Sequence, residues 1–204
     1  MASLRMARPL RPRDREPAPA RREVPDEELV ARARQGDRWA HEAIFRRHVE
    51  VVLGMATRML GHTGEADDVV QETFGSAFTK LDRLDDPRRL RSWLLGIAVH
   101  RVQRRLRSRK FLRFFGLAPD EEGGLFDLAT TEASPEIRTE LALIDTLLAR
   151  LPVEERVAWS LRHVEGEQLE DIAAITGVSL ATVKRRIGAV EVRVRAAVER
   201  GGGV

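Results

Sequence analysis

The 204-residue sequence contains no cysteine and no tyrosine, and only 5% of its residues are aromatic. The absence of cysteine excludes disulfides and thiolate metal sites, and it agrees with a reducing compartment. Because 43% of the residues are nevertheless hydrophobic, we expect aliphatic cores built from helices. No apolar run approaches the roughly 20 residues that a membrane-spanning helix needs, so no membrane insertion is expected.

The sequence also lacks a recognisable set of metal ligands or catalytic groups. His41 and His48 are seven residues apart and have no carboxylate cluster beside them, so core and rim positions are the preferred interpretation. Asp67 and Asp68 are the only candidates for paired carboxylates, and adjacent residues on a helix do not converge on one point. We therefore expect no metal, no cofactor and no catalytic residue, although an enzyme acting on nucleic acid is a third hypothesis.

The stretch Leu169 to Gly188, LEDIAAITGVSLATVKRRIG, has the spacing of a DNA-binding helix-turn-helix. A short helix is predicted over Leu169 to Thr176, followed by a left-handed cap at Gly177 and an N-cap at Ser179. The second helix carries one apolar stripe, and its opposite face is polar and basic. The predicted DNA contacts are Ser179, Thr182, Lys184, Arg185 and Arg186. The alternative is a helical hairpin with a solvated basic face.

Charge is distributed unevenly, although the net charge is only +3. The stretch between Pro87 and Pro119 contains ten lysines and arginines and no aspartate or glutamate. Asp86 followed by Pro87 predicts that a helix starts there. Such a density of one sign favours contact with a polyanion. The candidate nucleic-acid contacts are Arg88, Arg89, Arg91, His100, Arg101, Arg104 and Arg105. The alternative is a solubilising face that pairs with the acids of the preceding helix.

That preceding helix is predicted over GEADDVVQETFGSAFTKL, which begins at Gly64. It has a buried apolar side and an exposed acidic side. The acidic side carries Glu65, Asp67, Asp68, Gln71 and Glu72. Three interpretations stay open for it: a solvated face near a helix N-terminus, catalytic carboxylates, or a docking surface for a basic partner. Before it, one helix is predicted from Pro25 and Asp26 to Gly36, and another from Asp37 to about Leu60.

These patterns predict an all-α fold with two helical domains on a flexible tether. The expected boundaries are a disordered basic tail over 1–25, a first domain over 26–113, an acidic linker over 114–134, a second domain over 135–200 and a tail over 201–204. The basic tail has seven arginines and four prolines before residue 25. A mitochondrial transit peptide is the alternative for it, and its acids and prolines count against that alternative.

Taken together, these stretches resemble bacterial RNA polymerase sigma factors of the sigma-70 superfamily, in the extracytoplasmic-function subgroup. The stretch ADDVVQETFGSAF is similar to the family's region 2 helix that docks on core polymerase. LRSWLLGIAVHRVQRRLR is similar to the segment that melts and reads the −10 promoter element. LARLPVEERVAWSLRHVEGEQLEDIAAITGVSLATVKRRI is similar to region 4, which reads the −35 element. The resemblance covers about Asp26 to Val198.

The resemblance implies a non-enzymatic, cytoplasmic bacterial protein that directs promoter recognition and DNA opening. Its partners would be core RNA polymerase, through the clamp helices and the flap, and promoter DNA, both duplex and melted strand. An anti-sigma factor is a common further partner in the subgroup. The implied polymerase contacts are Asp67, Asp68, Gln71, Glu72 and Phe74. The loop from about Asp82 to Arg89 would capture a flipped base.

The sequence departs from the family pattern in places. Family members often carry further basic residues after the VKxR motif, whereas this chain has Gly188, Ala189 and Val190. The basic N-terminal tail is also outside the pattern. The runner-up hypothesis is a stand-alone helix-turn-helix repressor or activator, which would bind duplex operator DNA without polymerase, usually as a dimer.

Overall fold

The computed structural model describes residues 24–60, 64–114, 144, 146–148 and 150–201. Every regular element among these residues is helical, so the predicted all-α fold is confirmed. The predicted basic tail and acidic linker, and most of the helix expected to start at Pro135, lie outside the described residues. Of that helix, Ile144 and residues 146–148 are described, and they are helical.

The N-terminal unit contains four helices, α1 (Asp26–Arg34), α2 (Arg38–Leu60), α3 (Gly64–Thr79) and α4 (Leu90–Phe114). Two short 3-10 turns, η1 (Leu81–Arg83) and η2 (Pro87–Arg89), connect α3 to α4. The predicted helix starts at Asp37 and Asp86 have side-chain caps, whereas α1 begins after Pro25 without one. Asp37 accepts a hydrogen bond from the backbone N–H of Trp39 at 2.9 Å, and Asp86 accepts one from Arg88 at 3.1 Å.

Helix α4 is the central element of this unit, and it is buried on more than one side. Leu90, Leu94 and Ala98 recur at helical spacing and form one apolar stripe that is fully buried. Leu95 and Val99 lie outside that stripe and are also fully buried. The reason is that α4 packs against α2 and α3, and additionally against a helix of the C-terminal unit, so its buried sector is wider than one stripe.

The C-terminal unit contains α6 (Val153–His163), α7 (Leu169–Thr176) and α8 (Leu180–Gly201). The predicted bounds of α7 are confirmed. Gly177 ends that helix in the left-handed region at φ +67°, a conformation that glycine adopts without a Cβ clash. Ser179 accepts a hydrogen bond from the backbone N–H of Thr182 at 3.2 Å, as expected of an N-cap. The core between these helices includes Leu161, Ile172, Val183, Ile187 and Val190.

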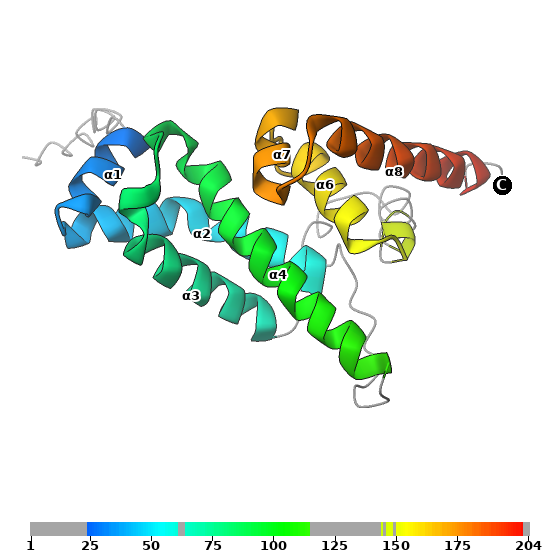
Figure 1. Ribbon diagram of the computed structural model, residues 1–204, viewed down its shortest axis with the longest axis horizontal. Helices are drawn as coiled ribbons and strands as arrows, with labels where there is room; N and C mark the ends of the chain where they lie inside the picture. Colours follow the sequence, from blue (N-terminus) through cyan, green and yellow to red (C-terminus); the bar gives the residue numbers. More distant parts are fainter. Residues whose placement is uncertain (1–23, 61–63, 115–143, 145, 149, 202–204) are drawn as a thin grey trace, which may run out of the picture.

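The two units touch through α7, which lies along the N-terminal half of α4 (Figure 1). Helix α8 runs away from this contact toward the C-terminus. Within the described ranges, no helix combines the length and the apolar character needed to cross a membrane.

Candidate nucleic-acid interface

The helix-turn-helix presents a basic surface along the N-terminal half of α8. Lys184 and Arg185 are exposed there, whereas Thr182 and Arg186 are half-buried. The hydroxyl of Ser179 is 3.0 Å from that of Thr182 and also caps the helix. The five predicted residues therefore lie together at the start of α8. The two exposed cations are the side chains best placed to reach a base edge or a phosphate.

The arginines of α4 separate into an inner row and an outer row. The inner row faces the acids of α3 in an antiparallel arrangement that we call the α3–α4 ion ladder, formed by Glu65, Asp68, Glu72, Arg101, Arg105 and Arg109. Glu72 accepts hydrogen bonds from Arg101 and, at 2.8 Å, from Arg105. Glu65 lies 3.1 Å from the Arg109 guanidinium. The pairing that the sequence left open as an alternative is therefore present for this row.

The outer row stays accessible. Arg88, His100, Arg104 and Arg107 are exposed, and the Arg104 side chain keeps 67% of its surface open although it lies 3.5 Å from Glu72. Two of the predicted contacts, Arg101 and Arg105, are largely covered, with 20% and 18% of their side chains exposed. The inner row consequently supports the packing of α4 on α3. The outer row is open to a polyanion, although Arg88, which lies in η2 just before α4, also forms an ion pair with Asp86 at 3.0 Å.

The ion ladder shifts the titration of its central acid. The hydrogen bond from Arg105 lowers the pKa of Glu72 below the ordinary value of 4.5, and Arg101 adds to this lowering against the opposing effect of burial. Glu72 therefore carries its charge at neutral pH. Because the pKa of Glu72 is lower in the folded than in the unfolded protein, its ion pairs stabilise the fold above about pH 4.5. This stabilisation is lost as the pH falls through the pKa that Glu72 has in the folded protein.

Glu72→Gln is accordingly expected to lower the free energy of unfolding by about 1 kcal/mol at neutral pH, a figure that allows for solvent screening of a partly exposed pair. The difference from wild type should shrink in acid, where the wild-type carboxylate is protonated as well. Urea denaturation at neutral and acid pH measures both values. Glu50→Gln, at an exposed position of α2, is the matched control. A constant difference across the pH range would contradict the assignment.

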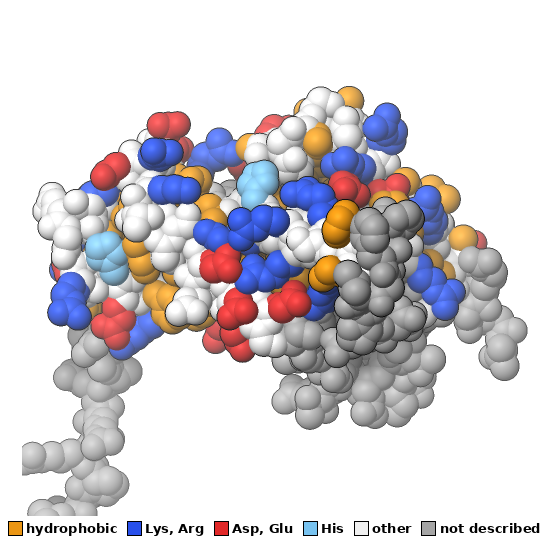
Figure 2. All heavy atoms as spheres, turned by 60° about the horizontal axis from the view of Figure 1, so that its bottom comes forward, with side chains coloured by type: hydrophobic (Ala, Val, Ile, Leu, Met, Phe, Trp, Pro, Cys, Tyr) orange, Lys and Arg blue, Asp and Glu red, His pale blue; other side chains and the backbone are white. Residues whose placement is uncertain are grey.

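The acidic side of α3 is largely open to solvent. Asp67, Asp68 and Gln71 are exposed as expected, and Glu72 is half-buried. Phe74 is only 3% exposed, and its ring packs against Phe45 and Phe78 at centroid distances of 4.8 and 5.9 Å. Its position thus holds α3 against α2. Figure 2 shows acidic and basic side chains interspersed on the face to which α3 and the C-terminal half of α4 contribute.

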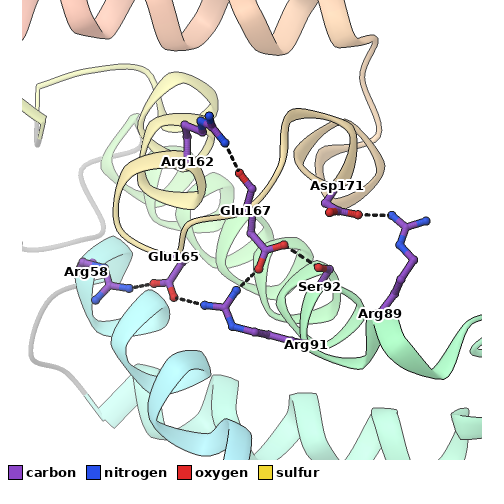
Figure 3. A network of polar contacts seen from close by, with 8 residues as sticks. All are labelled: Arg58, Arg89, Arg91, Ser92, Arg162, Glu165, Glu167 and Asp171. Atoms are coloured by element: carbon purple, nitrogen blue, oxygen red, sulfur yellow. Dashed lines mark hydrogen bonds and ion pairs between the residues drawn. The ribbon is translucent and has the colours of Figure 1, made fainter. Parts of the chain in front are cut away.

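Two further predicted contacts, Arg89 and Arg91, are bound to the C-terminal unit. Arg89 contacts Asp171 of α7 at 2.5 Å, and Arg91 lies between Glu165 and Glu167 (Figure 3). Ser92 donates a hydrogen bond to Glu167 at 2.6 Å. We call this set of six side chains the interdomain latch. Sequence reasoning missed its acids because they follow no periodic pattern and lie 74 to 82 residues from their partners.

A cavity of about 380 Å³ lies beside the latch, between the loop that precedes α4 and helix α7. Its lining includes Arg83, Asp85, Trp93 and His100 from the N-terminal unit. Ala174 and Ile175 of α7 form the opposite wall. The cavity therefore combines an aromatic ring, two arginines and two aspartates with an apolar wall from the other unit.

The two histidines considered for a metal site have separate partners. His48 is buried with its Nε2 atom 3.1 Å from Asp26, while His41 contacts the backbone oxygen of Asp37 and the ring of Phe78. Among the residues with described positions, no group of three or more side chains is arranged to hold a metal ion.

Comparison with known proteins links these surfaces to a family. Residues 44–111 match the family model Sigma-70 region 2, and residues 141–198 match Sigma-70, region 4. The chain is similar to the RNA polymerase sigma factor CnrH of Cupriavidus metallidurans, with 32% identity over 85% of this chain and 94% of that protein. It is also similar to the ECF RNA polymerase sigma factor SigM of Mycobacterium tuberculosis, with 33% identity over 85% and 84% of the two chains.

The fold has matching solved structures. A structure of CnrH in complex with the cytosolic domain of CnrY covers 86% of this chain and 97% of that one, with a TM-score of 0.60 and 28% identity. The region 2 match falls within the N-terminal unit, and the described part of the region 4 match falls within the C-terminal unit.

Proposed function

The chain belongs to the sigma-70 family of RNA polymerase sigma factors, in the extracytoplasmic-function subgroup, and from this premise we propose which of its surfaces meet the polymerase and the promoter. It is a promoter-recognising subunit whose partners are core RNA polymerase and promoter DNA. The observation that carries this conclusion is the match of region 2 and region 4, in that order, to its two helical units.

The exposed acidic side of α3 is proposed as the docking surface for core polymerase. Asp67, Asp68 and Gln71 are open to a partner, and a run of acidic charge favours a basic surface opposite. Glu72 and Phe74 support this surface indirectly. Glu72 is bound by the arginines of the ion ladder, and Phe74 is buried. Their part in docking is therefore to position α3.

The outer row of α4 is proposed as the grip on the −10 element. Arg88, Arg104 and His100 are exposed cations or donors, and Arg89 and Arg91 join them when the two units separate. The cavity beside Trp93 is the proposed receptor for a base extruded from the melted strand, because its aromatic ring suits a stacked base and the polar groups of its lining, two arginines and two aspartates, suit the edge of that base.

The start of α8 is proposed to read the −35 element. Arg185 is the candidate for a bidentate base contact, and Lys184 and Arg186 are candidates for phosphate contacts. Ser179 and Thr182 set the helix start through their mutual contact. The chain itself performs no catalysis in this proposal, since the polymerase supplies the chemistry, and its place of action is the bacterial cytoplasm.

An anti-sigma factor is proposed as a further partner. The similar protein CnrH has a solved structure in complex with the cytosolic domain of CnrY. A partner of this kind would cover the exposed surfaces of α3 or α8.

Run-off transcription with purified core polymerase and a library of promoter fragments tests the proposed function. Transcripts are expected only when this protein is added, with start sites that define two upstream elements. Core polymerase alone is the negative control. A discrete shift of duplex DNA by the protein alone, without new transcripts, would contradict the proposal and indicate a stand-alone regulator.

A further inference from the structure

We propose that Arg34 of α1 is a positioning residue for base capture, because its guanidinium group holds the backbone of the loop that forms one side of the cavity beside Trp93. This inference rests on the proposed role of that cavity as the receptor for an extruded base. We call the segment from Leu81 to Arg89, which contains η1 and η2, the capture loop. Arg34 precedes this loop by 47 residues and belongs to a different helix.

The first support is a bridge between Arg34 and two backbone oxygens of the capture loop. The Nη2 atom of Arg34 lies 3.1 Å from the oxygen of Leu81 and 2.5 Å from that of Leu84. Its Nε atom also donates to the Leu81 oxygen, at 3.3 Å. Leu81 is the first residue of η1 and Leu84 directly follows this turn. One guanidinium group therefore fixes both ends of the turn relative to α1.

The second support is the position of Leu84. This residue is 4% exposed and lies between η1 and η2, outside any helix. A buried carbonyl group outside regular structure needs a donor from elsewhere in the fold, and Arg34 supplies one. Leu84 also lines the cavity. The backbone that Arg34 holds is therefore part of the wall that a captured base would meet.

The far end of the capture loop is held by bonds within the loop itself. The side chain of Asp86 accepts a hydrogen bond from the backbone N–H of Arg88 at 3.1 Å. The backbone oxygen of Asp86 accepts one from the N–H of Arg89 at 2.9 Å. Helix α1 packs against both η1 and η2 (Figure 1). The loop thus has a local anchor at Asp86 and a second anchor on α1 through Arg34.

The residues between these anchors carry polar groups of the cavity. Arg83 and Asp85 are exposed and line it, and they directly precede and follow Leu84 in the chain. A shift of the Leu84 backbone would therefore move both side chains relative to the ring of Trp93. Because a base is selected by donors and acceptors at fixed places, such a shift would change which base edge fits.

The contact depends on the geometry of Arg34 more than on its charge. The nearest carboxylate oxygen, on Asp82, is 3.9 Å from Nε and belongs to a side chain that is 88% exposed, so this ion pair contributes little. The main acceptors are neutral carbonyl groups, which a planar fork of donors can bridge. Lysine has one ammonium group on a flexible stem and cannot reproduce this bridge. Arg34→Lys therefore keeps the charge and removes the positioning contact.

Base preference of the reconstituted polymerase tests this role. The strongest promoter found in the run-off experiment is changed to all four bases at each position of its −10 element. Arg34→Gln and Arg34→Lys are both expected to lower the preference for the best base over the next best by at least about fivefold at one position, as for the loss of one hydrogen bond to the base. Preferences in the −35 element, which α8 reads in the proposed function, should stay unchanged.

Arg38→Gln is the matched control, because Arg38 is an exposed arginine at the start of α2, four residues beyond Arg34. This variant should keep the wild-type preferences. Wild-type preferences in Arg34→Lys would show that charge alone matters and would overturn the positioning role. An equal loss of transcription from all promoter variants would overturn it too, since that result indicates only less folded protein.

Amide hydrogen exchange of the free protein tests the same contact without polymerase. The backbone N–H groups of Arg83 and Leu84 donate to the oxygens of Lys80 and Leu81 at 2.9 and 3.2 Å. In Arg34→Gln these two groups should exchange at least about fivefold faster than in Arg38→Gln, because the turn is no longer held against α1. Equal exchange would overturn the proposal.

The two measurements separate this inference from the function on which it rests. If wild type yields no promoter-specific transcript, the proposed function fails, whereas the exchange rates still report whether Arg34 holds the loop. Faster exchange with unchanged base preference would show that the loop is held by Arg34 but that its position does not select the base, which would also overturn the proposal.

Discussion

Replacing Asp67 and Asp68 together with lysine is expected to weaken binding to core polymerase by about 100-fold. Both side chains are exposed in the first turns of α3, and they present negative charge without covering the helix core. If each meets a basic group of the polymerase, each reversal turns an attraction into a repulsion, and about 1.4 kcal/mol per site gives this factor. Titration of labelled protein with core polymerase measures the affinity.

The N-terminal unit offers a closely matched control for this double variant. Glu27 and Glu28 are also adjacent, exposed acids in the first turn of a helix, and Glu28 lies 4.0 Å from Arg32 much as Asp68 lies 3.9 Å from Arg105. Glu27→Lys/Glu28→Lys should share any general effect of charge on folding or on polymerase binding. Equal affinities of the two double variants would exclude the α3 docking surface.

Replacing Arg185 with alanine is expected to lower recognition of the −35 element by about 1–3 kcal/mol, which is the range for losing a bidentate base contact. The loss should depend on sequence, because a variant without the guanidinium no longer distinguishes the base it contacted. Lys184→Ala should behave differently, with a smaller loss that is similar for all sequences, as expected of a phosphate contact. Footprints of polymerase reconstituted with each variant measure both effects.

The control for this prediction lies further along the same helix. Arg195 is exposed on α8, about 15 Å beyond Arg185 at the helical rise per residue. Arg195→Ala removes the same side chain and the same charge outside the helix-turn-helix. A footprint of the Arg185 variant that matches the Arg195 variant on every promoter would rule out base reading by Arg185.

Local features of the fold were predictable because their causes are local. The cap at Ser179, the left-handed Gly177 and the bounds of α7 follow from residues within one or two turns of one another. The helix starts at Asp37 and Asp86 are of the same kind. The position of the exposed cations on α8 followed from helical periodicity alone.

The division of the α4 arginines into two rows was harder to predict from the sequence. Arg101, Arg105 and Arg109 recur every fourth residue, and the acids of α3 recur at similar spacing in the opposite direction, so a ladder was a visible pattern. Whether that row faces α3 or solvent depends on how the two helices pack. The sequence therefore raised the pairing as an alternative without assigning which arginines take part.

The interdomain latch was beyond sequence reasoning. Arg91 and Glu167 are 76 residues apart and belong to units that a flexible tether was expected to separate. Each acid alone has the ordinary interpretation of a solvated residue near a helix start. Only the placement of α7 on α4 brings the acids to the arginines, and that placement depends on how the two helices pack.

The α3–α4 ion ladder changes how a mutational scan of α4 should be interpreted. Alanine at an outer position such as Arg104 removes a surface cation and leaves the amount of folded protein nearly unchanged. Alanine at Arg101 or Arg105 leaves Glu72 with fewer partners in a half-buried place, and a loss of about 1–2 kcal/mol can lower cellular abundance several-fold. If the outer row binds DNA as proposed, both kinds of variant would reduce transcription, but only the outer ones would report on DNA binding, so abundance has to be measured alongside activity.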